Sequence, residues 1–362
     1  MWDTIQKLTY RAKADIPKAA AELEEQLRDR RELPLAGIHG ERLYLTGATK
    51  LEWRATQLRT MYEQLPDCKN VTENILLDAW ASASIEGANV SLTQVKQHLG
   101  NPQTKDERMV VNAVRGSNHA YGRPITRKNL RTLWERVTEG VCENTHLDSK
   151  PYRFGMVEIG SASKTVHTPA TPEQLPDLME QWFRFREQDQ SLIGSFVAHF
   201  YFVYVHPFCD GNDRTARIVN ASSLYHAGWK KMKSLPLSNA INNELSGYYR
   251  SLEDSETQLS DQTGKWLDLS PFVSYMLDVF EQCMIDAALS QNELTPNESK
   301  LLERMNRVSG TAEITAKKTA AILGNSESAA RNTLRSLVKK GYLTEDMSKV
   351  PFIYSLEQNL PL

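Results

Sequence analysis

The longest apolar run in the chain, Phe196–Val205, constrains the fold more than any other segment. It reads F-V-A-H-F-Y-F-V-Y-V, and Pro207 follows it after a single histidine. A helix that crosses a bilayer needs about 20 apolar residues, so this run is too short to span a membrane. We expect a helix over Ile193–Val205 that is buried in the protein core and ended by Pro207.

Composition and charge indicate a folded protein of two or three domains. The chain has 362 residues, of which 40% are hydrophobic and 24% charged. A formal net charge of -2 gives no strong global attraction to nucleic acid or membranes, so such binding would need a local patch. The first residues, M-W-D-T-I-Q-K-L-T-Y-R, are charged where a signal peptide needs an apolar core.

The cysteines are widely spaced and form no CxxC pair, which argues against a zinc site or a dense disulfide framework. They are Cys68, Cys142, Cys209 and Cys283. Together with the N-terminus, they favour a cytoplasmic protein without a membrane partner.

Apolar residues at helical spacing predict helices over most of the chain, including Lys50–Leu65 and Thr72–Ser84. Ser91 with Gln94 predicts a capping box at the start of another helix. The segment Met156–Pro169 differs, because two β-prone runs flank a Gly-Ser-Ala-Ser turn. This pattern predicts a β-hairpin.

The C-terminal part has the pattern of a separate module. Residues 291–297 are polar and contain Pro296, which predicts a linker. Over 298–362 we expect a helix at Glu298–Val308, a second at Ala316–Leu323, a third capped by Ser326 and then two short strands. This order predicts a winged helix-turn-helix domain.

Polar and charged side chains crowd a turn directly after the apolar run, in Y-V-H-P-F-C-D-G-N-D-R-T-A-R at Tyr204–Arg217. Asp210 and Gly211 form a turn pair, and Gly211 allows a positive φ. We expect Asn212 to be the N-cap of a helix over 213–227. The first N–H groups of a helix, with the helix dipole, form an anion site.

Three further side chains suggest what the anion is. Arg214 and Arg217 lie three residues apart on one helix face, and two guanidiniums beside a helix N-terminus favour a polyphosphate. Asp210 could hold Mg²⁺, which commonly binds one or two carboxylates together with phosphates. His206 is then available to take a proton from a hydroxyl. Each residue alone is equally typical of a charged surface corner, but together they predict a nucleotide site.

The stretch H-P-F-C-D-G-N-D-R-T-A-R resembles the signature of the Fic family, HPFx(D/E)GN(G/K)RxxR. Family members are mainly helical proteins that mostly transfer AMP from ATP to a hydroxyl of a target protein. The resemblance covers roughly Glu52 to Met284. The P-Y-R at Pro151 and the hairpin ending in H-T-P resemble the approach to the family's flap, which aligns the target segment. The segment Y-Y-R-S-L, from Tyr248, resembles the part that packs on the base.

The resemblance implies an all-α fold, mainly helical with a small β-hairpin flap, in addition to the C-terminal winged helix-turn-helix. It implies an N-terminal helical region over 1–120 that carries an inhibitory motif, and a catalytic core over 121–290. The implied roles are general base for His206, core anchor for Phe208, Mg²⁺ ligand for Asp210, α-phosphate contacts for Gly211 and Asn212, β-phosphate for Arg214, γ-phosphate for Arg217, and nucleotide contacts for Tyr248 and Tyr249.

One position departs from the family pattern, because Asp213 stands where Gly or Lys is usual. A carboxylate there suits the positive end of the helix dipole. It could also repel a polyphosphate, which leaves the preferred nucleotide open.

A second motif lies upstream, where S-A-S-I-E-G occupies Ser82–Gly87. A glutamate at the C-terminal end of a helix is disfavoured by about 0.3–1 kcal/mol unless a cation pairs with it. The stretch resembles the family's inhibitory motif (S/T)xxxE(G/N), with Ser82, Glu86 and Gly87 in register. The resemblance implies that Glu86 pairs with Arg217 and occupies the γ-phosphate position.

The expected recognition helix of the C-terminal module carries Arg331 and Arg335, four residues apart, in a locally basic segment. This pattern suits contacts to DNA phosphates, although winged helices also serve as protein-docking modules. The expected function is transfer of AMP from ATP, with Mg²⁺, to a hydroxyl of a target protein. A nucleotide-sensing DNA-binding regulator and a hydrolase that removes AMP are the alternatives, and a homodimer stays open.

Overall fold

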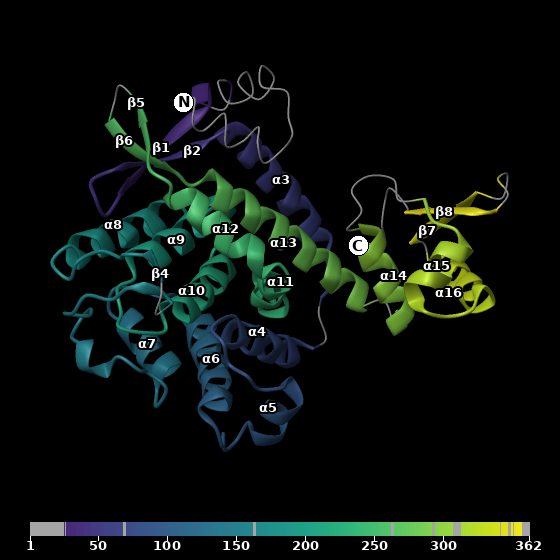
Figure 1. The fold of residues 1–362 in the computed structure, drawn as a ribbon, viewed down its shortest axis with the longest axis horizontal. Coiled ribbons are helices and arrows are strands. Elements are labelled where there is room, and N and C mark those ends of the chain that lie inside the picture. Colours follow the sequence, from purple (N-terminus) through teal and green to yellow (C-terminus); the bar gives the residue numbers. More distant parts are fainter. Residues whose placement is uncertain are drawn as a thin grey trace. The chain divides into compact units, whose positions relative to one another are not determined.

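The computed structural model describes residues 25, 27–67, 70–161, 164–261, 264–291, 294–306, 313–340, 342–346, 349 and 351–356 (Figure 1). Two compact units divide the chain. The first comprises Met1–Arg59 and Lys69–Glu281, and the second comprises Thr60–Cys68 and Gln282–Leu362. In the described residues, no helix has both the length and the apolar character to span a bilayer.

Helices dominate the chain up to residue 291, as the sequence predicts. They are α3 (Ala48–Gln64), α4 (Val71–Ile85), α5 (Leu92–His98), α6 (Lys105–Gly122), α7 (Leu130–Thr138), α8 (Leu175–Gln188), α9 (Leu192–Val205), α10 (Asn212–His226), α11 (Leu237–Asn243), α12 (Leu245–Glu256) and α13 (Ser270–Gln291), with short 3₁₀ helices at Thr145–Leu147 and Lys230–Ser234. The capping box of Ser91 and Gln94 is confirmed at the start of α5.

Helix α9 forms the centre of the first unit, and every one of its residues is buried. It packs between α8 and α10, which Figure 1 shows on either side of it. The helix ends at His206, whose backbone is left-handed with φ 54°, one residue before Pro207. The predicted buried helix and its termination by proline are therefore confirmed.

A four-stranded sheet was not expected from the sequence. Its strands are β1 (Arg30–Ala36), β2 (Arg42–Thr46), β5 (Leu259–Asp261) and β6 (Gly264–Asp268), in the order β1-β2-β6-β5. Strands β2 and β6 are parallel, and the outer pairs are antiparallel. The signal was weak because the alternating burial of Leu33 and Leu35 spans a few residues and is interrupted by a proline. Strand β6, which pairs with β2, lies more than 200 positions later in the sequence.

The predicted β-hairpin is confirmed, and its role as a flap stays a prediction. Strands β3 (Ile159–Ser161) and β4 (Lys164–His167) pair antiparallel, with Ile159 opposite His167. The hairpin ends at His167 and is followed by Pro169, as the H-T-P sequence suggested.

The second unit contains the predicted order of elements, α14 (Pro296–Asn306), α15 (Ala316–Leu323), α16 (Glu327–Lys339), β7 (Leu343–Asp346) and β8 (Ile353–Leu356). The Ser326 side chain caps α16 by accepting a hydrogen bond from the Ala329 N–H. Leu301, Leu334 and Tyr354 belong to the buried apolar cluster that holds these elements together. The winged-helix assignment and DNA binding by this unit stay predictions.

Candidate active site

The turn between α9 and α10 is built around Gly211 and Asn212. Gly211, with φ 67°, precedes the first helical residue, so it occupies the N-cap position that we expected for Asn212. A Cβ at Gly211 would lie 2.6 Å from Thr138 Cγ2, so both the backbone and the space require glycine. Asn212 instead binds Phe208 twice, accepting from its N–H and donating to its carbonyl, each at 2.9 Å. The expected capping role of Asn212 is therefore wrong, because its amide closes the turn.

His206 has the geometry of a general base. Its Nδ1 lies 3.2 Å from the Val203 carbonyl, which can only accept a hydrogen bond, so Nδ1 carries the proton and Nε2 keeps its lone pair. Burial lowers the pKa of His206 to about 4, although the Val203 carbonyl opposes that shift. The imidazole is therefore neutral at physiological pH. The left-handed backbone of His206 is unique among non-glycine residues in the described ranges, and such strain is common at functional sites.

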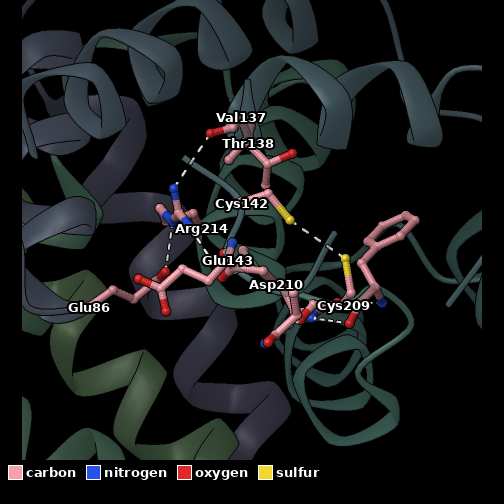
Figure 2. A network of polar contacts seen from close by, with 12 residues as sticks. Glu86, Val137, Thr138, Cys142, Glu143, Cys209, Asp210 and Arg214 are labelled. Atoms are coloured by element: carbon pink, nitrogen blue, oxygen red, sulfur yellow. Dashed lines mark hydrogen bonds and ion pairs between the residues drawn. The ribbon is translucent and has the colours of Figure 1, made fainter. Parts of the chain in front are cut away.

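The carboxylate of Asp210 is held by two backbone N–H groups (Figure 2). Oδ1 accepts from Gly211 at 2.6 Å, and Oδ2 accepts from Glu143 at 2.9 Å. The Trp134 indole donates to the Asp210 carbonyl at 2.7 Å. Because Gly211 N–H bonds Asp210, it is not directed at a phosphate in this conformation.

The residues around Asp210 fit a Mg²⁺ ion that takes a single carboxylate ligand from the protein. Among the described residues, no three His, Cys, Asp or Glu side chains gather into a metal-binding cluster. A single, partly exposed carboxylate with unused lone pairs is typical of Mg²⁺ bound mainly through substrate phosphates and water. Asp210 alone would hold the ion on the protein side.

Glu86 bridges the two arginines of α10. Its Oε2 lies 2.7 Å from Arg214 Nε, and its Oε1 lies 2.6 Å from Arg217 Nη2. Figure 2 shows the Glu86 carboxylate directed at the Arg214 guanidinium. Ser82 adds two contacts, because its hydroxyl and its carbonyl accept from Arg217 at 2.8 and 2.9 Å. The expected pairing of Glu86 with Arg217 is present, and the contact to Arg214 was not expected.

Positive charge is concentrated at this site. The side chains of Arg214 and Arg217 are each only 2% exposed, and burial of unpaired guanidiniums would be costly. Burial lowers the pKa of Arg217, but Glu86 and Tyr248 more than compensate, so the pKa lies above its ordinary value. Arg217 Nη1 is buried and has no hydrogen-bond partner within the described residues. That group therefore has unused hydrogen-bond donors.

Asp213 lies half-buried in the first turn of α10. Burial raises the pKa of this carboxyl, and Arg217 and Arg214 oppose the rise. The acid therefore lies within the field of the two cations that we expect to bind phosphate.

The remaining predicted residues differ in their exposure. Gly87 is exposed and has φ 87°, directly after Glu86, the C-cap of α4. Tyr248 is fully buried, and its hydroxyl lies 3.1 Å from His199 Nε2. Tyr249 is 51% exposed, packs edge-on against Tyr248 and donates to the Ile85 carbonyl. Of the two tyrosines that we expect to contact the nucleotide base, Tyr249 is therefore the one that is accessible from solvent.

Arg153 is a site residue to which sequence reasoning assigned no role, although it belongs to the P-Y-R segment. It is buried, and its Nε donates to the His206 carbonyl at 2.9 Å while its N–H donates to the Pro207 carbonyl. Its Nη1 donates to the Gly155 carbonyl at 2.8 Å. Burial lowers the pKa of Arg153 to about 10, so the side chain stays charged. Arg153 joins the segment before the β3–β4 hairpin to the turn between α9 and α10.

Comparison with known proteins finds a matching family model and curated relatives. Residues 124–224 match the family model described as Fic/DOC family, a range that includes β3, β4, α9 and most of α10. "Protein adenylyltransferase Fic" of Drosophila mojavensis is 27% identical over 165 residues, covering 44% of this chain and 28% of that protein. The protein of the same name in Drosophila grimshawi is 26% identical over 219 residues, covering 56% of this chain and 41% of that protein. The chain thus spans less than half the length of these curated relatives.

Solved structures share the fold. A Fic family protein from Desulfovibrio desulfuricans G20 has a TM-score of 0.57 at 22% identity, covering 86% of this chain and 96% of that one. Fic-1 from C. elegans (aa134–508) has a TM-score of 0.50 at 18% identity, covering 68% of this chain and 74% of that one. Residues 124–224 thus match the Fic/DOC family model, and the chain shares the helical fold of a solved Fic family protein.

Proposed function

We propose that this protein transfers AMP from ATP to a hydroxyl group of a target protein, and that Glu86 holds the activity in check. One observation carries the proposal. A neutral imidazole with an unprotonated Nε2, on His206, lies directly before the turn into α10, whose buried Arg214 and Arg217 share the Glu86 carboxylate. The names of the curated relatives, protein adenylyltransferases, support the reaction class.

The reaction follows from the state of His206. The target hydroxyl gives its proton to Nε2 while its oxygen attacks the α-phosphorus of ATP. The new bond joins that oxygen to the α-phosphorus, the bond to the β-phosphate bridge breaks, and pyrophosphate leaves. The Val203 carbonyl fixes the tautomer by accepting from Nδ1. The low pKa of His206 keeps the base unprotonated at neutral pH.

The phosphates would be held at the N-terminus of α10. The first-turn N–H groups and the helix dipole attract the α-phosphate. Arg214 and Arg217 would contact the β- and γ-phosphates, and the unpartnered Nη1 of Arg217 supplies one donor. Mg²⁺ held by Asp210 would neutralise phosphate charge when bound.

Glu86 competes with the phosphates for the same guanidiniums. A carboxylate bonded to Arg214 Nε and Arg217 Nη2 uses the donors that a triphosphate needs. Binding of ATP in a reactive pose therefore requires Glu86 to leave. Loss of the Glu86 side chain should release the activity.

The test incubates the purified full chain with Mg²⁺ and ATP labelled on the α-phosphate, and measures label on the protein and on added cell extract. We expect severalfold more labelling for Glu86→Gly than for the wild type, and none for His206→Ala. Glu139→Gly is a matched control, because Glu139 also ends a helix, α7, but its side chain is 72% exposed and its nearest cation, Arg115, is 3.9 Å away.

The alternatives give different results. No His206-dependent label with any nucleoside triphosphate would contradict the proposal and favour a nucleotide sensor. Loss of AMP from a modified protein, faster with the wild type than with Glu86→Gly, would instead identify a hydrolase.

A further inference from the structure

A second histidine, His167, contacts the helix that carries His206. It ends the flap strand β4, and its side chain is 9% exposed. Its Nε2 lies 2.8 Å from the Tyr204 carbonyl, and its Nδ1 lies 2.8 Å from the Glu256 carboxylate. A carbonyl and a carboxylate only accept hydrogen bonds, so both ring nitrogens must donate. This arrangement requires the doubly protonated imidazolium.

The hydrogen bond from His167 to Tyr204 lies at the C-terminal end of α9, where the dipole of that helix acts on His206. The C-terminus of a helix favours a protonated histidine, which would weaken His206 as a base. At the end of α9, however, the Tyr204 carbonyl accepts from His167, and the His206 carbonyl accepts from Arg153. Two cations thus bind the last carbonyls of the helix and oppose a third positive charge on His206.

We propose that His167 is a positioning residue for His206: its imidazolium, held by Glu256, fixes the end of α9 and keeps the base unprotonated. The proposal rests on the proposed function only in calling His206 the base. His167 would thus connect the flap to the turn that carries His206 through its charge as well as through its hydrogen bonds.

The charged groups near His167 and His206 shift the pKa values of the two histidines in the directions that the proposal requires. Burial lowers the pKa of His167, but Glu256 and Asp213, together with the Tyr204 carbonyl, raise it above its ordinary value. Burial is the largest cause of the low pKa of His206, and His167 and Arg153 lower it further, while Glu86 opposes them. Removal of the charge on His167 should therefore raise the pKa of His206.

Asp213 contributes to the same set of charges. It is one of the acids that favour the charged form of His167, and His167 in turn favours ionised Asp213.

The test reads protonation directly and needs no activity. The full chain is labelled with ¹⁵N-histidine, and ring nitrogens are followed by NMR from pH 8 downward in wild type, His167→Gln and Glu256→Gln. The His206→Ala variant assigns the base. We expect both His167 nitrogens to be protonated at pH 7 in the wild type. In both variants we expect the His206 midpoint to rise by roughly half a pH unit.

His146→Gln is the matched control, because His146 is exposed and should leave the His206 midpoint unchanged. A neutral His167 ring at pH 7, or an unchanged His206 midpoint in both folded variants, would overturn the proposal. Circular dichroism confirms folding, and Glu256→Gln keeps the imidazole in place if His167→Gln does not fold. Failure of AMP transfer would contradict the proposed function but would not change the result expected from these titrations.

Discussion

Cys142 Sγ lies 3.6 Å from Cys209 Sγ, one residue before Asp210 (Figure 2). The sulfurs are in contact but well beyond the ~2.05 Å of a disulfide bond. Asn144 donates to the Cys209 carbonyl and the Glu143 N–H donates to Asp210, so the loop after α7 is bound to this turn by several contacts.

These thiols should react slowly with alkylating reagents, because only the thiolate is nucleophilic. Burial raises the pKa of Cys142, and burial together with Cys142 raises the pKa of Cys209 to about 12. We expect iodoacetamide at pH 7.5 to modify both more slowly than it modifies the urea-unfolded chain, with Cys142 reacting before buried Cys209. Peptide mass spectrometry over time provides the measurement. Equal rates in folded and unfolded chains would contradict the burial argument.

Alanine at Gly211 should destabilise the protein more than alanine at a glycine that also has a positive φ but has free space around it. Gly211→Ala combines a positive φ with a clash against Thr138 Cγ2, for an expected cost of about 2–4 kcal/mol. Gly228→Ala, where φ is 103° and no atom lies within 4 Å of the added Cβ, should cost about 1 kcal/mol. Urea unfolding compares them. Thr138→Ser removes the clashing methyl group and should recover part of the loss in the Gly211→Ala background; no recovery would argue against the clash.

Neutralising Asp213 should strengthen ATP binding. Removal of a negative charge from the first turn of α10 strengthens the attraction between the two arginines and the phosphates. We therefore expect KM for ATP to fall about two- to fivefold. The measurement uses Asp213→Asn in the Glu86→Gly background, and Asn separates the charge from a change in helix propensity. Asp177→Asn, an exposed acid in the first turn of α8, is the control. A KM that stays equal or rises would show that repulsion of phosphate by Asp213 is negligible.

Asp78 should destabilise the protein above pH 6. Burial raises the pKa of this carboxyl to about 6, although it accepts a hydrogen bond from the Ser238 N–H at 2.6 Å. Because the folded pKa exceeds the unfolded one, the favourable contribution is complete below about pH 4 and is lost as the pH rises through 6. We expect Asp78→Asn to add about 1–2 kcal/mol at pH 8 and little at pH 4.

The matched control for Asp78 is Glu73→Gln on the same helix, whose carboxylate is 63% exposed. Thermal unfolding at the two pH values gives the difference. A gain from Asp78→Asn that is equal at both pH values would mean that ionisation is not its cause.

The sequence predicted those parts of the fold that local signals determine. Helix α9, the flap hairpin and the capping box at Ser91 follow from apolar runs, turn residues and caps within a few positions. The sheet of β1, β2, β5 and β6 was missed because its pairing joins segments far apart in the chain. A short strand gains its stability from its neighbours, and those are not visible in local periodicity.

In the candidate site, too, local features were predicted from the sequence and contacts between distant segments were missed. The spacing of the signature placed Asp210, Arg214 and Arg217 correctly on one turn and one helix face. The contact of Glu86 with Arg214 depends on side-chain geometry between α4 and α10, and the ion pair of His167 with Glu256 joins the flap to α12. Such contacts between distant segments have no sequence signal in a single chain. Asn212 was misassigned because an asparagine beside a glycine suits both an N-cap and a turn closure.

Glu86 is the C-cap of α4, at the boundary between that helix and an exposed glycine. Helix ends fray at a much lower free energy than helix interiors, so the carboxylate can separate from the arginines while the rest of α4 keeps its packing. The position of the residue therefore makes access to the two guanidiniums depend on the stability of a single helical turn. Under the proposed function, temperature or any contact that stabilises or destabilises that turn would set the resting fraction of molecules in which Glu86 has left the two arginines.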